Sequence, residues 1–164
     1  MSLRGISVAT LVLVGAAATK PLPAQTTPVQ VVAQLYRDFA WEAVIDEPQW
    51  RGLELFQQPR PVLARYFDDN LIALILADRA CVARTHEECR LDFAPIWDSQ
   101  DPGATELKVL PTSDSSVVRV AFRWPPDRHI ITLTYHLART PGGWRIHDIV
   151  SANSGSLVAL LARR

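Results

Sequence analysis

The sequence predicts an α+β domain in which N-terminal helices pack on a curved four-stranded antiparallel meander sheet, with a short C-terminal helix at the end of the chain. Three observations support this fold class. Apolar residues recur at helical spacing in the first half of the chain, and they alternate with polar residues in the second half. Turns that contain proline or glycine separate the alternating segments, as they do between neighbouring antiparallel strands.

Residues 1–24 have the layout of a secretory signal peptide. Arg4 gives a positive start, an apolar run follows, and a small residue, Ala24, precedes the expected cut. The alternative is an uncleaved membrane anchor, but the apolar run has about 13 residues whereas a membrane span needs about 20. We therefore expect a single mature domain, residues 25–164, in the periplasm or secreted, with no membrane span after processing.

The composition excludes several classes of partner and cofactor. Removing residues 1–24 takes away Arg4 and Lys20 and no acid, so 15 of 17 basic residues remain against 17 acidic ones, a net charge of about −2. No block of like charge is present, so we expect no nucleic-acid partner. The chain has no Gly-rich phosphate loop, no Gly-x-Ser-x-Gly elbow and no His-Glu-x-x-His motif. We therefore expect no cofactor and no metal.

The first helix is predicted from its start signal and its apolar stripe. Thr27 is a good N-cap and Pro28 suits the first helical position, so we expect a helix over residues 28–43. Its stripe consists of Val32, Leu35, Tyr36, Phe39 and Ala43. Residues 44–60 then form an irregular connection, with a helical turn around residues 53–56.

A second helix is expected to begin at Pro61 and to run to about residue 80. Its apolar stripe consists of Leu63, Tyr66, Phe67, Leu71, Leu74 and Ile75. Cys81 and Cys89 follow, and in an exported chain two cysteines this close indicate a disulfide, which adds about 2.5 kcal/mol under the chain-entropy model. The alternatives are free thiols, or a zinc site with His86 that falls short of the four ligands zinc takes.

The second half of the chain predicts four strands in a meander. They lie around residues 106–109, 118–124, 131–137 and 144–150. The two tight turns between the last three strands set which residues face each other. The expected pairs are Val120 with Leu133, Phe122 with Ile131, Leu137 with Ile146, and Tyr135 with Asp148. This register puts the apolar residues of three successive strands on one face, and a one-residue slip would destroy that agreement. Residues 154–163 then form the short closing helix.

Asp148 is the first candidate for a functional residue, because the predicted register puts its carboxylate in an apolar row opposite Tyr135. Such a carboxylate must find a hydrogen-bond partner or change its pKa. It either fixes the packing or serves as a pocket acid or base, with Tyr135 orienting it. On the other sheet face, His136 and His147 are expected to lie opposite each other, either as a solvated pair or as a metal-binding or pH-sensitive pair.

The segment 92–103 combines acids, aromatic residues and turn formers. Its three aspartates do not have the spacing of an EF-hand calcium loop. One interpretation is a loop whose apolar residues plug the core, namely Phe93, Ile96 and Trp97. In the other, the loop contacts a ligand through Asp92, Trp97, Gln100 and Asp101.

Four segments of the chain carry a resemblance to a known family: residues 31–39, 91–101, 143–150 and 156–161. Through them the chain resembles the exported bacterial family called domain of unknown function 3828, which is similar to the cystatin-like, or nuclear transport factor 2-like, superfamily. The resemblance implies that the signature positions are Asp92, Gln100, Asp101, Trp144 and Asp148. Ala94 stands where that family usually has a second acid, which weakens any metal role for the loop.

The superfamily resemblance also implies a cone-shaped fold whose mouth holds a small ligand. Its expected lining is Tyr36, Trp97, Tyr135 and Asp148. From this we expect a non-catalytic module that binds a small ligand or a periplasmic protein. The first alternative is a small-molecule hydrolase or isomerase that uses Asp148 and Tyr135. The second is an immunity-type inhibitor of a periplasmic toxin or hydrolase.

Overall fold

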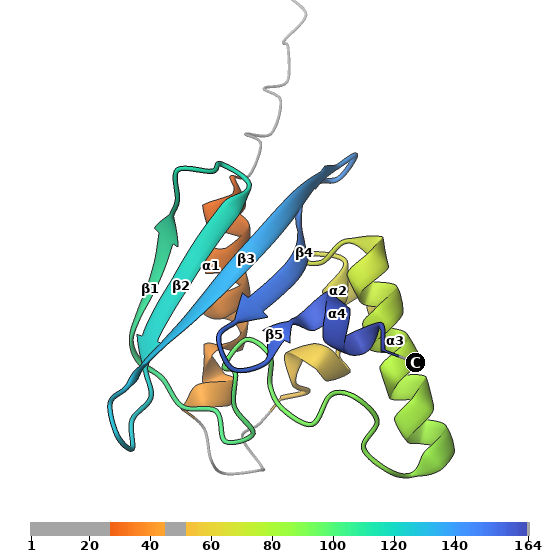
Figure 1. The fold of residues 1–164 in the computed structure, drawn as a ribbon. Helices are drawn as coiled ribbons and strands as arrows, with labels where there is room; N and C mark the ends of the chain where they lie inside the picture. Colours follow the sequence, from red (N-terminus) through yellow and green to blue (C-terminus); the bar gives the residue numbers. More distant parts are fainter. Residues whose placement is uncertain (1–26, 45–51, 164) are drawn as a thin grey trace, which may run out of the picture.

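A computed structural model describes residues 27–44 and 52–163, and these residues form an α+β domain (Figure 1). The predicted signal peptide, residues 1–24, lies outside the described residues, as do residues 45–51 of the predicted connection. An antiparallel sheet of five strands has the order β1-β2-β3-β4-β5, and helix α1 packs on one of its faces. Helices α3 and α4 gather beside β4, at the other end of the sheet from β1.

Helix α1 (Pro28–Phe39) begins and ends close to where the sequence predicts. Thr27 and Gln30 form a capping box: the Thr27 hydroxyl accepts from the Gln30 backbone N–H at 3.2 Å, and the Gln30 side chain accepts from the Thr27 N–H at 2.8 Å. The chain continues as the 3₁₀ helix η1 (Ala40–Ala43), which completes the predicted span. A short 3₁₀ helix, η3 (Leu55–Gln57), overlaps the helical turn expected around residues 53–56.

The prediction of one continuous second helix is wrong, because the chain breaks into α2 (Arg60–Leu63) and α3 (Asp69–Thr85). Between them the backbone leaves the helix to bond with β4. The Ile146 N–H donates to the Tyr66 carbonyl at 2.7 Å, and the Asp68 N–H donates to the Ile146 carbonyl at 3.0 Å. Asp68 then starts α3 as its N-cap, since its carboxylate accepts from the Leu71 N–H at 2.9 Å. A tertiary contact therefore interrupts a stripe that looks continuous in the sequence.

All four predicted strands are present, and the sheet has a fifth strand of two residues that the sequence analysis missed. The strands are β1 (Thr105–Pro111), β2 (Val117–Arg123), β3 (Ile130–Thr140), β4 (Gly143–Ser151) and β5 (Gly155–Ser156), and α4 (Leu157–Leu161) follows. Three of the predicted pairings are confirmed: Val120 with Leu133, Phe122 with Ile131, and Leu137 with Ile146.

The fourth pairing is wrong, because β4 contains a β-bulge. Ile146 lies opposite Leu137, but Asp148 lies opposite His136, so His147 is one residue too many on β4. Beyond the bulge, each β4 residue lies on the face of the sheet opposite to the predicted one. Tyr135 therefore lies opposite Ile149 instead of Asp148. The expected pairing of His136 with His147 fails for the same reason.

The space between α1 and the sheet is filled with aromatic side chains. Tyr36, Trp97 and Tyr135, the expected lining of an open cone, are 3%, 1% and 0% exposed. The Tyr36 ring meets the Trp97 ring edge-on at a centroid distance of 5.3 Å, and the Tyr36 hydroxyl donates to the Ile96 carbonyl at 2.8 Å. These residues form a packed core.

None of the helices within residues 27–44 and 52–163 is long and apolar enough to cross a membrane.

Candidate ligand-binding pocket

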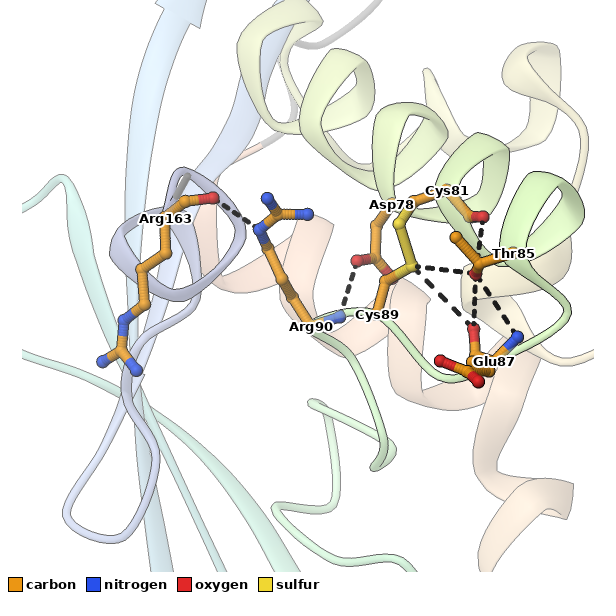
Figure 2. Close-up of a disulfide and its surroundings, with 7 residues drawn as sticks. All are labelled: Asp78, Cys81, Thr85, Glu87, Cys89, Arg90 and Arg163. Carbon is orange, nitrogen blue, oxygen red and sulfur yellow. Dashed lines mark hydrogen bonds between the residues drawn. A yellow bond between two sulfur atoms is a disulfide. The ribbon is translucent and has the colours of Figure 1, made fainter.

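The chain between α3 and β1, residues 86–104, is the loop that carries most of the predicted ligand contacts. Figure 2 shows that a disulfide between Cys81 and Cys89 ties the start of this loop to the end of α3, which confirms the predicted bridge. Next to the disulfide, the Thr85 hydroxyl donates to the Cys81 carbonyl at 3.0 Å. The Arg90 backbone N–H donates to the buried carboxylate of Asp78 at 2.9 Å, so α3 holds the loop at a second point.

The middle of the loop is anchored in the core. Trp97 is buried, and its indole N–H donates to one carboxylate oxygen of Glu42 at 3.0 Å. The other oxygen of Glu42 accepts from the Leu55 N–H at 2.6 Å, so this carboxylate joins the loop to both η1 and η3. Burial raises the pKa of Glu42, although its two hydrogen bonds oppose that shift.

Asp98 connects the loop 86–104, by hydrogen bonds of its side chain, to the turn between β4 and β5. Its backbone has a positive φ of 51°, a region that aspartate tolerates better than most residues. Its carboxylate accepts hydrogen bonds from the hydroxyls of Ser151 and Ser154, at 2.9 and 2.8 Å, and from the side-chain amide of Asn153 at 2.8 Å. Asp98 is one of the three aspartates of the segment 92–103, and no pattern in the sequence predicts this role for it.

A pocket of about 370 Å³ lies between this loop, η1 and η3. It brings together three of the predicted binding residues, namely Asp92, Gln100 and Asp101. The Gln100 amide donates to the Asp92 carboxylate at 3.3 Å, and the Trp124 indole N–H donates to the Asp101 carbonyl, also at 3.3 Å. Trp97 does not line the pocket, but it contacts two lining residues: its indole N–H donates to Glu42, and its backbone N–H donates to the Ala94 carbonyl at 3.0 Å.

The described lining of this pocket is acidic and partly aromatic. The acids are Glu42, Glu54, Glu88, Asp92 and Asp101, and the aromatic residues are Trp41, Phe56 and Phe93. No Lys, Arg or His belongs to the described lining. Sequence reasoning missed Trp41, Glu42, Glu54 and Glu88, since they lie in three separate segments and no spacing connects them.

Asp148 and Tyr135, the proposed acid–base pair, are not brought together. The Asp148 carboxylate accepts from the Ser156 hydroxyl at 2.6 Å and from the Val158 N–H at 3.0 Å, so it holds the start of α4. Tyr135 bonds instead to the Tyr36 hydroxyl at 2.8 Å, and burial raises the pKa of Tyr135 well above its ordinary value. The structure therefore places Asp148 in a helix cap and Tyr135 in the core.

The remaining sequence candidates lie apart from the pocket. The ring of His147 bonds to the Asp68 carboxylate at 2.6 Å, on an exposed part of β4. The guanidinium of Arg139 lies over the Trp144 ring, 5.1 Å from its centroid. Within the described residues no three His, Cys, Asp or Glu side chains are grouped in a way that could hold a metal ion.

Comparison of the chain with protein-family models, with curated proteins and with solved structures found no significant match. The α+β fold, the disulfide and the pocket are therefore properties read from this chain alone.

Proposed function

We propose that this protein is an exported, non-catalytic binding module whose acidic pocket takes a small organic cation. The observation that carries the proposal is a hollow whose described lining combines five carboxyl groups and three aromatic side chains and includes no basic residue. Carboxylates attract a cation through space, and aromatic faces attract it through the ring quadrupole.

The size of the pocket favours a molecule over a bare ion. A volume of about 370 Å³ falls in the range of small-molecule sites, roughly 300–1,000 Å³. Glu42 already uses both of its carboxylate oxygens on Leu55 and Trp97. The other four acids, Glu54, Glu88, Asp92 and Asp101, are therefore the groups that would meet the ligand.

Export, and kinship with domain of unknown function 3828, are parts of the same proposal. A disulfide that closes a short loop suits an oxidising compartment. Helix α1 across an antiparallel sheet suits the cystatin-like or nuclear transport factor 2-like arrangement. The hydrolase alternative loses its basis, because Asp148 caps α4 while Tyr135 is buried in the core. No observation favours the inhibitor alternative over a small-ligand site.

The proposal is tested by titrating the protein with 1,4-diaminobutane and, separately, with tetramethylammonium. Binding is measured by isothermal calorimetry and by the change in amide chemical shifts. We expect saturable binding that weakens as salt is added, with shifts at residues 88–102. The double variant Asp92→Asn/Asp101→Asn should weaken binding by about tenfold or more. The matched control is Asp69→Asn/Asp127→Asn, which removes two exposed carboxylates outside the pocket and should change the affinity less than twofold.

Two results would overturn the proposal. One is the absence of saturable binding by either cation. The other is an equal loss of affinity in the pocket variant and in the control variant, since that result would show a general effect of net charge.

A further inference from the structure

We propose that the protein has a second binding site, for the carboxylate or phosphate group of a small anionic ligand, in a basic pocket alongside α1. This pocket has a volume of about 540 Å³ and is lined by Arg37, Arg65 and Arg145. It lies between α1, the segment after α2 and the β3–β4 turn, whereas the acidic pocket lies between η1, η3 and the loop 86–104. No residue lines both pockets, so the two sites can be varied separately.

Arg145 is the residue that the fold orients toward an anion. Its Nε donates to the Ala64 carbonyl at 2.8 Å, and its Nη1 donates to the Trp144 carbonyl at 2.7 Å. Both acceptors are neutral, so these bonds hold the half-buried guanidinium in place without cancelling its charge. Across residues 27–44 and 52–163 no hydrogen-bond acceptor is found for Nη2, which lies beside Gly142 at the pocket.

Gly142 keeps the space beside this group open. A Cβ atom at position 142 would stand 3.1 Å from the Arg145 Nη2, which is closer than most real Cβ contacts. A side chain there would therefore displace the guanidinium or cover its free edge. The tight β3–β4 turn thus leaves the outward donor of Arg145 accessible from the pocket.

Arg37 and Arg65 supply the remaining charge. The Arg37 guanidinium bonds to the neutral amide oxygen of Gln34, one turn earlier on α1, at 2.6 Å. The Arg65 guanidinium lies over the Tyr66 ring, 5.3 Å from its centroid, and bonds to the Asp38 carboxylate at 3.1 Å.

Asp38 offsets only one of the three positive charges. Its carboxylate also accepts from the Tyr66 hydroxyl and from the Gln34 amide, the latter at 2.7 Å, so it is engaged from three sides. The pocket therefore keeps a surplus of about two positive charges. Arginine donors in a fixed fork match the paired oxygens of a carboxylate or phosphate group.

The test is a titration of the full chain at low ionic strength, with inorganic phosphate and, separately, with succinate. Binding is measured by the change in the chemical shifts of the backbone amides and of the arginine Nε–Hε groups. Saturable shifts at Arg145 with phosphate alone, with succinate alone or with both would identify the class of oxyanion. The variant Arg37→Gln/Arg65→Gln should weaken binding by about tenfold or more. It leaves the backbone contacts of Arg145 in place, so the fold is expected to persist.

Two controls separate this site from net charge and from the acidic pocket. Arg84→Gln/Arg128→Gln removes two positive charges elsewhere, and it should change the affinity less than twofold. Asp92→Asn/Asp101→Asn should leave anion binding intact, whatever it does to cation binding. The proposal is overturned if neither anion gives saturable shifts, or if the two arginine double variants lose affinity equally.

Discussion

Removing the Asp148 carboxylate should destabilise the protein, because three hydrogen-bond donors lose the oxygens that accept from them. These donors are the Ile149 N–H at 2.9 Å, the Val158 N–H at 3.0 Å and the Ser156 hydroxyl at 2.6 Å. Each such bond contributes about 1 kcal/mol net, so Asp148→Ala should lower the free energy of unfolding by about 3 kcal/mol. Asp148→Asn should cost only about 1 kcal/mol, because its amide oxygen still accepts from both backbone groups.

The assay is equilibrium urea unfolding followed by tryptophan fluorescence, with the m-value compared between variants. The control is Asp69→Asn, because Asp69 has a side chain that is 90% exposed and a surface ion pair with Arg60. Surface pairs contribute about 0–1 kcal/mol, so this variant should stay close to the wild type. If Asp148→Ala is no less stable than Asp69→Asn, the helix-cap reasoning is wrong.

Two further predictions concern the groups that hold the loop 86–104 in place, namely the disulfide and Glu42. Replacing both Cys81 and Cys89 by Ser should lower the free energy of unfolding by about 2.5 kcal/mol, because a loop with a sequence separation of 8 is no longer closed in the unfolded chain. Adding reductant to the wild type should give the same loss of stability. An unchanged urea midpoint would contradict this prediction. Burial raises the pKa of Glu42 above its ordinary 4.5, so the folded state binds the carboxyl proton of Glu42 more tightly than the unfolded state does. The stability that this proton contributes is therefore fully present below pH 4.5. It is lost as the pH rises through the raised pKa of the folded state. The unfolding free energy of the wild type relative to Glu42→Gln should therefore fall between pH 4 and pH 8, whereas a flat difference would refute the burial argument.

Several local features could be predicted from the sequence, because their signals lie within a few residues of the structure they direct. Thr27, Pro28 and Gln30 carry both halves of the cap that begins α1. The four-residue turn at 125–128 sets the β2–β3 register, and alternation along both strands agrees with it. Cys81 and Cys89 are the two cysteines of the chain, so the sequence offers one possible pairing.

The candidate site was only partly predictable. Asp92, Gln100 and Asp101 lie in one loop, so an acidic segment that lines the pocket is visible in the sequence. Glu42 is joined to that loop by its hydrogen bond with Trp97, and it also accepts from the N–H of Leu55, the residue after Glu54; no periodicity connects these positions. The basic pocket was missed altogether, since its arginines come from α1, from the segment after α2 and from β4.

The α+β class, the first helix, the alternating strands and the disulfide all follow from local patterns in the amino-acid sequence, since each depends on spacing within one segment. The places where two such patterns are interrupted depend instead on contacts between distant segments. The helix breaks at residues 66–68 because that backbone bonds to Ile146, and the β4 bulge at His147 lies next to the same contact. A bulge adds one residue without altering the alternation before it, and so it exchanged the faces of Asp148 and Ile149.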